Sequence, residues 1–300
     1  MSDSEMPLPL PRASPVPAGE RYTALDVLRG VAILGILVMN IQAFSMPLSA
    51  YMNPTSFGVL SGLDRWIWGL SYLFAAEKFM TLFSMLFGAG VALMASRLEH
   101  RGLPSAPVHY RRMLFLALIG MVHAYGLWFG DVLFTYAACG TWVYLLRRLR
   151  PKTLLIVGLI IFAVASGLSL MAGLSYPQWP EEEKAEILYS WQPSPAEVAR
   201  EVATYQSGWW GQMEARVPQA MMLETSALLF FVMWKAGGLM LVGMALFKWG
   251  ILTGEADARI YRRLAAAGFG IGFPLVLFGT WRHFAEGFSV EWSHFLGGLP

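Results

Sequence analysis

The chain has 300 residues, of which 56% are hydrophobic and 14% are charged, and its formal net charge is +2. Because soluble domains usually carry about 25% charged residues, this composition excludes an ordinary soluble domain and indicates an all-α, multispanning membrane protein. The small net charge gives no support for a nucleic-acid partner, since the basic residues gather in short loops, where membrane topology explains them.

The first membrane span is predicted shortly after a proline-rich start. Residues 1–20 contain five prolines and few large apolar groups, which predicts a disordered cytoplasmic tail. Thr23 and Asp26 have the spacing of a capping box, so a helix is expected to begin near Ala24. From there to Ser45 is about 22 residues, which spans about 33 Å as a helix.

The rest of the chain contains further apolar runs of bilayer-spanning length. Residues 66–97 are too long for one straight span, so we expect a break at Glu77–Lys78, with a half-inserted or interfacial helix before it. After the break, Ser84, Gly88 and Ala92 form a stripe of small residues that favours close helix packing. The later spans are expected at residues 79–95, 113–129, 132–146, 154–174, 222–247 and 264–281.

These spans predict a bundle of about seven helices with a polar insertion. Residues 21–174 are expected to form five spans and residues 220–300 two more. Between them, residues 175–219 are predicted to be extracytoplasmic and to hold one amphipathic helix on the membrane surface. Arginine-rich loops alternate with acidic or neutral ones, which predicts a cytoplasmic N-terminus and a multi-pass protein.

Four motifs occur in order at separated positions. They are LDVLRGVAILGILVMNI, KFMTLFSMLFGAG, RRMLFLALIGMVHAYGLWFGDVLFTYAACG and GLMLVGMALFKWGIL. Together they resemble the YeiB-like family of bacterial inner-membrane proteins, whose function is not established. The resemblance covers residues 21 to about 254 and implies a location in the bacterial inner membrane. Family members usually continue with further membrane helices, so the chain resembles a C-terminally truncated member.

The opening LD-x-LRG-x-A motif is also similar to that of membrane acyltransferases, namely the glucosaminide acetyltransferases and bacterial glycan acyltransferases. This second resemblance implies transfer of an acyl group from a cytoplasmic thioester, with acyl-coenzyme A as candidate donor, to a glycan or lipid-linked acceptor across the membrane. Those families place a catalytic histidine at or just after the first span. Residues 39–64 of this chain contain no histidine, which is a departure from that pattern.

His123 is the candidate catalytic residue because it lies inside a predicted span, where an ionisable group is costly and usually faces the bundle interior. If Gly130 turns the chain, Asp131 can fold back toward the imidazole and orient it as a general base. The structural alternative is that His123 bonds a neighbouring helix and Asp131 caps the next one.

Five further polar residues are candidate substrate-binding groups, four at the predicted outer ends of spans and one near mid-span. A lysine near mid-span, such as Lys235, should face protein or water, and a carboxylate on another helix, such as Glu77 or Asp131, is its expected partner. The alternative is that helix ends are polar because water is there. The five residues are Asn40, Glu77, Lys78, Glu224 and Lys235.

Arg29, Arg111 and Arg112 are candidate donor-binding residues on the predicted inner face, where they can gather around phosphate groups. Arg29 can instead extend its side chain to the lipid headgroups. All three arginines can also serve only to keep their segments on the cytoplasmic side of the membrane. Because no P-loop, dinucleotide fingerprint or metal-spaced His/Cys cluster occurs, we predict no metal site and no bound cofactor.

Three functions therefore stay open from the sequence. The first is an acyltransferase-like protein. A His123–Asp131 pair beside a tunnel that reaches Arg29 would support it. The second is a transporter or carrier for a small anionic or lipid-linked solute, with Lys235 as a charge partner. The third is a non-catalytic envelope scaffold, which would have a packed interior without cavities.

Overall fold

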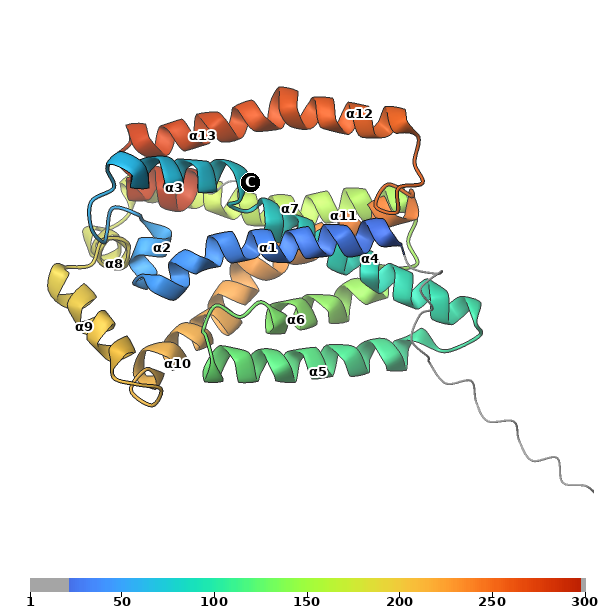
Figure 1. Cartoon of the computed structure of the whole chain (residues 1–300), viewed down its shortest axis with the longest axis horizontal. Helices are drawn as coiled ribbons and strands as arrows, with labels where there is room; N and C mark the ends of the chain where they lie inside the picture. Colours follow the sequence, from blue (N-terminus) through green and yellow to red (C-terminus); the bar gives the residue numbers. More distant parts are fainter. Residues whose placement is uncertain (1–21, 298–300) are drawn as a thin grey trace, which may run out of the picture.

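The computed structural model describes residues 22–297, and within this range all regular structure is helical (Figure 1). The residues of the predicted tail, 1–20, lie outside the described range. The longer helices are α1 (Thr23–Ser45), α4 (Lys78–His100), α5 (Ser105–Gly126), α7 (Pro151–Ser175) and α11 (Met233–Lys248). The shorter ones are α2 (Leu48–Met52), α3 (Gly62–Phe74), α6 (Leu133–Val143), α8 (Glu181–Trp191), α9 (Pro195–Gln206), α10 (Met213–Met222), α12 (Ala258–Ala267) and α13 (Phe273–Ala285).

The helices run side by side between two ends of the bundle (Figure 1). We call the end where α1 begins, α4 ends and α5 begins the basic end, because its loops carry the arginine clusters. The opposite end, with α2, α8 and α9, is called the far end. The charge rule predicts that the basic end is cytoplasmic.

The start of α1 differs from the expected capping box. Thr23 is already the first helical residue, and Tyr22 is the N-cap without a side-chain hydrogen bond. A capping side chain must belong to the residue before the helix, so the prediction of a Thr23–Asp26 capping box is wrong. Asp26 instead pairs with Arg29 one turn later, with Oδ1 3.2 Å from Nη1.

The break between α3 and α4 is where the sequence indicates it. The helix α3 ends at Phe74, Glu77 adopts a left-handed backbone conformation with φ of 64°, and α4 begins at Lys78. The helix α3 contacts α13, and both run along the surface of the bundle (Figure 1). The predicted break at Glu77–Lys78 is therefore confirmed.

The core of the bundle is built by α4, α7 and α11, which pack at very short range. A Cβ atom added at Gly88 of α4 would overlap the carbonyl group of Met240 in α11, and one added at Gly243 would overlap Met85. Small residues therefore allow the two backbones to touch, as the small-residue stripe predicts. Cys139 is fully buried in the same core, in agreement with a packing role.

Five helical segments among the described residues are long and apolar enough to cross a membrane. The expected third and fourth spans correspond to α5 and α6, which pack against each other but are not among these five. A membrane protein with several spans is supported, and the number of seven and the orientation stay predictions. The five segments are Thr23–Ser45, Gly62–His100, Pro151–Gln178, Met213–Lys248 and Ala258–Ala285.

The polar insertion folds as more than the one expected helix. The expected amphipathic helix is α9, whose Val198 is buried and whose first turn is held by a capping box of Ser194 and Glu197. This helix ends at Gln206, so Trp209 lies beyond it. The helix α8 precedes α9, and α10 continues through the π-helical segment η4 (Leu223–Val232) into α11.

Candidate functional site

His123 and Asp131 meet at the corner between α5 and α6. The imidazole Nδ1 lies 2.8 Å from the Asp131 Oδ1 atom, and the Oδ2 atom accepts a hydrogen bond of 2.7 Å from the Phe134 N–H in the first turn of α6. Both arrangements considered for Asp131 thus occur together, since one carboxylate pairs with the histidine and caps the helix. Gly120 allows this close approach, because a Cβ atom there would come within 2.9 Å of Oδ2.

The pair has the geometry of an oriented imidazole. The side chain of Asp131 is 1% exposed, whereas that of His123 is 34% exposed, so the ring can be reached from outside while its partner cannot. When Nδ1 donates its proton to the carboxylate, Nε2 keeps a lone pair and can accept a proton.

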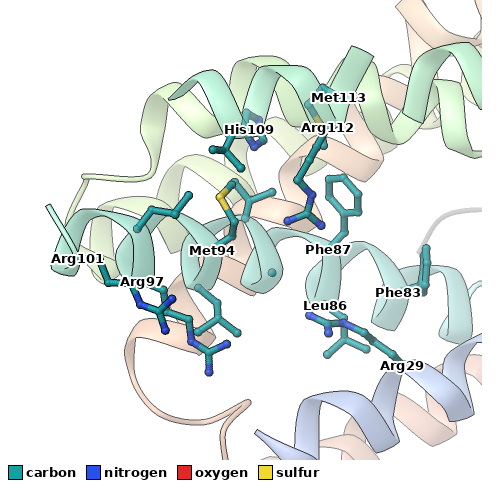
Figure 2. Close-up of a pocket in the computed structure, with 15 residues that line it drawn as sticks. Arg29, Phe83, Leu86, Phe87, Met94, Arg97, Arg101, His109, Arg112 and Met113 are labelled. Carbon is teal, nitrogen blue, oxygen red and sulfur yellow. The ribbon is translucent and has the colours of Figure 1, made fainter. Parts of the chain in front are cut away.

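A basic cavity of about 560 Å³ opens at the basic end between α1, α4 and α5 (Figure 2). Its floor is apolar, whereas four arginines surround its mouth. Arg29 reaches it from α1 across Gly90 of α4, and Arg112 reaches it from α5. The apolar residues of the floor are Phe83, Leu86, Phe87, Val91, Met94 and Met113.

The basic cavity contains two of the three predicted arginines. Arg111 is exposed and does not line it, whereas Arg97 and Arg101, one turn apart near the end of α4, complete it. Arg97 also stacks over the Tyr22 ring, 5.7 Å from its centre. From the sequence, Arg97 and Arg101 count only as topology signals, although their spacing of four residues places both on one helix face.

A second cavity of about 470 Å³ lies between α4, α6, α7 and α11, and we call it the ion-pair cavity. Lys235 Nζ lies 2.6 Å from Glu77 Oε2 in its wall, so the lysine has the carboxylate partner that the sequence predicts on another helix. Hydroxyl groups supply much of the remaining polar lining; they belong to Tyr51, Thr81, Ser84, Thr135, Tyr136, Ser166 and Ser169.

The basic cavity and the ion-pair cavity follow each other along α4. Met80 and Ser84 line the ion-pair cavity, and Phe87 and Val91, farther along the same helix face, line the basic cavity. Tyr136 of α6 stands between them, with its hydroxyl 2.6 Å from Ser84 Oγ and its ring centre 5.2 Å from that of Phe87. One aromatic ring therefore lies between the cavity at the basic end and the cavity beyond it.

The remaining predicted substrate-binding residues do not join the ion-pair cavity. Glu224 lies beside Tyr125, near Asp131, and not beside the Glu77–Lys235 pair. Asn40 lines neither cavity, and Lys78 donates from Nζ to the backbone oxygen of Tyr72 at 2.9 Å. The structure therefore does not bring the candidate substrate-binding residues into one pocket.

A buried histidine cluster near the end of the described chain was missed by the sequence analysis. His283 has Ser293 Oγ 2.7 Å from Nδ1 and the Tyr72 hydroxyl 2.9 Å from Nε2, and that hydroxyl donates to the Gly297 oxygen. These residues come from α3, α13 and the segment after it, so no local spacing relates them. The cluster ties α3 to α13.

Comparison with known proteins finds three relatives. The chain is 33% identical to the uncharacterized protein YeiB of Escherichia coli over 291 residues, which cover 94% of this chain and 70% of YeiB. It is 37% identical to the uncharacterized protein YxaH of Bacillus subtilis over 161 residues, which cover 51% of this chain and 39% of YxaH.

The third relative is an uncharacterized 39.9 kDa protein in the amylase 3′ region of Bacillus acidopullulyticus. It is 32% identical over 152 residues, which cover 51% of this chain and 41% of that protein. No family model and no solved structure matches the chain. The matches to the two Bacillus proteins thus span less than half of each relative.

Proposed function

This chain belongs to the YeiB-like family. For this family member we propose an acyltransferase-like function in the membrane, and the support for it comes from the cavities of the structure. It takes an acyl group from a cytoplasmic thioester donor and delivers it to an acceptor on the other side of the membrane. The basic cavity carries this proposal, because it combines four arginines with an apolar floor at the end of the bundle that the charge rule places inside.

An acyl-coenzyme A matches the chemistry of the basic cavity. Its phosphate groups are anions, for which arginine offers two parallel N–H donors, and its thioester arm contains alkyl segments that an apolar surface can cover. Arg29 and Arg112 reach the cavity from two different helices, so an anion between them is held from both sides (Figure 2). The apolar floor, which includes Phe87 and Met113, suits the arm and the acyl chain.

The His123–Asp131 pair supplies the base in this proposal. His123 Nε2 removes the proton from an acceptor hydroxyl or amine, whose oxygen or nitrogen then attacks the thioester carbonyl carbon. The new C–O or C–N bond forms, the C–S bond breaks, and the proton passes from His123 to the leaving thiolate. Asp131 stabilises the imidazolium between these steps, and its burial keeps it fixed.

The two successive cavities along α4 support passage across the bundle. An arm bound in the basic cavity points along α4 toward Tyr136, beyond which the hydroxyl-lined ion-pair cavity begins. In this proposal the Tyr136 ring moves aside when the donor enters, and its hydrogen bond to Ser84 breaks. The packed interior expected of a non-catalytic scaffold differs from this structure, which contains both cavities.

Binding of acetyl-coenzyme A to the purified full chain tests the donor site. We expect Arg112→Gln to weaken binding about tenfold, the loss of about 1.4 kcal/mol from one charge-assisted contact. Isothermal titration calorimetry in detergent measures the Kd. Arg111→Gln is the matched control, since it removes the same charge from the neighbouring position, which does not line the cavity.

The same preparation separates binding from chemistry. With glucosamine as probe acceptor, release of free coenzyme A thiol reports transfer, and His123→Ala should lower its rate by about 10²- to 10⁴-fold while donor binding is retained. Wild-type protein that binds no acetyl-coenzyme A at millimolar concentration removes the proposal. Equal losses from Arg111→Gln and Arg112→Gln would show that only net charge matters.

A carrier for a small anionic or lipid-linked solute is the second candidate function, and the Glu77–Lys235 ion pair favours it. A charged pair in the wall of a cavity inside the bundle can exchange its mutual contact for a solute. Uptake of labelled glycerol phosphate into vesicles that contain the protein and no coenzyme A would support the carrier function. Release of free coenzyme A thiol without such uptake would support the acyltransferase function.

A further inference from the structure

A third cavity, of about 510 Å³, lies at the far end, and we call it the far-end cavity. It is enclosed by the end of α1, the corner between α5 and α6, α9 and the segment that leads into α10. Its walls are strongly aromatic, since Phe44, Phe57, Trp128, Phe129 and Tyr205 all line it. None of the candidate site residues discussed above lines it.

Arg216 of α10 opens into the far-end cavity although it is only 3% exposed. Its Nη1 atom donates to the Gly126 backbone oxygen at 3.0 Å, and its Nη2 atom donates to the side-chain oxygen of Gln212. Both acceptors are neutral, and no carboxylate among residues 22–297 pairs with this guanidinium. Burying a positive charge without a negative partner is costly, so the position calls for an anionic group.

Glu201 of α9 lies in the same cavity but not in contact with Arg216. Its Oε1 atom accepts a hydrogen bond of 3.0 Å from the Leu48 N–H, at the start of α2. Burial raises the pKa of the Tyr205 phenol, Glu201 raises it further and Arg216 partly offsets the rise, so Tyr205 lies within the electrostatic influence of both charges. Two opposite charges therefore open into one aromatic cavity without neutralising each other directly.

This arrangement determines the charge of a suitable ligand. A simple anion would be attracted by Arg216 but repelled by the carboxylate of Glu201. A simple cation would be attracted by Glu201 but repelled by Arg216. A molecule with both charges can pair with both groups, while the aromatic walls cover the carbon atoms between its charges. Charge-assisted hydrogen bonds of this kind are strong when they are shielded from water.

We propose that the far-end cavity binds a small zwitterion, whose phosphate or carboxylate oxygens pair with Arg216 and whose primary ammonium group pairs with Glu201. Free phosphoethanolamine and the headgroup of phosphatidylethanolamine share this chemistry. The inference does not depend on acyl transfer, because it uses none of the residues assigned to that reaction.

Thermal unfolding of the full chain in phosphatidylcholine nanodiscs tests this site. Phosphoethanolamine at saturating concentration should raise the unfolding midpoint by about 2–4 °C. Inorganic phosphate and phosphocholine should raise it less, because the first lacks the cation and the second has no N–H to donate. A second set of nanodiscs made with phosphatidylethanolamine identifies the source, since a lipid ligand raises the midpoint there without any soluble additive.

Variants connect the effect to the cavity. Glu201→Gln keeps an acceptor for Leu48 but should abolish the preference for phosphoethanolamine over phosphate. Since Arg216→Gln can prevent folding, Val202→Phe serves as a second variant that fills the cavity without changing a charge. Arg200→Gln is the control, because Arg200 is exposed on the same helix and does not line the cavity.

Two results would overturn the inference. One is a midpoint that neither phosphoethanolamine nor phosphatidylethanolamine raises in the wild-type chain. The other is a preference for phosphoethanolamine over phosphate that persists unchanged in Glu201→Gln together with a rise that persists unchanged in Val202→Phe. Loss of the preference in Glu201→Gln and loss of the rise in Val202→Phe, with both retained in Arg200→Gln, supports the site, whichever of the two sources produces it.

Discussion

Glu77 has a backbone conformation that residues other than glycine rarely adopt. Its φ of 64° lies in the left-handed region, where a residue with a Cβ atom costs about 1–2 kcal/mol. Its carboxylate contacts Lys235 from a helix 158 residues away. The ion pair thus holds the break between α3 and α4 against the centre of the bundle.

The Glu77–Lys235 pair should show coupling in a double-mutant cycle. Each of Lys235→Met and Glu77→Gln leaves one partner without its contact, whereas the double variant removes both groups, so its destabilisation should be smaller than the sum. Because the Glu77 side chain is 58% exposed, we expect a coupling of only about 1 kcal/mol.

Unfolding in detergent, followed by circular dichroism, measures this coupling. Lys152→Met is the control, since Lys152 is exposed at the start of α7. Strictly additive effects would contradict a stabilising pair.

His123 illustrates which contacts can be predicted from residue types alone. An ionisable group inside an apolar run predicts a partner, and the Gly130–Asp131 corner identified that partner correctly. The approach of Arg97 and Arg101 to Arg29 was not predicted, because it depends on how α1 packs against α4. Spacing within one helix can be read from the sequence, whereas the distance between two helices cannot.

At the scale of elements, α4 organises the molecule. One of its faces lines two cavities in succession, and another face packs against α11 with backbone contact at Gly88 and Gly243. The small-residue stripe predicted such a contact but not its partner. Any helix with matching small residues could have filled that role.

Gly88→Ala should disturb this contact strongly. The added Cβ atom would overlap the Met240 backbone, which cannot rotate away as a side chain can, so we expect a destabilisation of about 1–3 kcal/mol. Gly30→Ala in α1 is the matched control, because nothing lies within 4 Å of the added atom and alanine favours the helix. Thermal unfolding in detergent compares the two, and equal midpoints would refute the close packing.

At the scale of the whole molecule, large apolar side chains cover much of the surface. Leu34 in α1 is 68% exposed and Phe269 near α13 is 76% exposed, as befits helices that face lipid. The arginine-rich loops lie together at the basic end (Figure 1). Hydrophobicity therefore supports a multispanning bundle, and loop charge predicts that its basic end is cytoplasmic.

Cysteine labelling tests the predicted orientation. In a Cys139→Ala background, Val59→Cys at the far end should react with a membrane-impermeant maleimide on intact cells, because Val59 is 80% exposed in a predicted outer loop. Arg148→Cys, at an exposed position of the basic end, should react only after the membrane is opened. Reaction of both from the same side would contradict the seven-span topology.

The sequence by itself determined the helical class and the break before α4, and it offered Asp131 as one of two kinds of partner for His123, because these follow from apolar periodicity, backbone breakers and residues close in the chain. Only the tertiary structure decided which polar groups share a cavity. Glu77 and Lys235 meet, whereas Asn40 and Glu224 stay apart from them, although all four are polar groups in or beside apolar segments. The physical reason is that the rotation and tilt of each helix are set by packing against its neighbours, such as Gly88 against Met240, and a single sequence does not state which neighbour it will be.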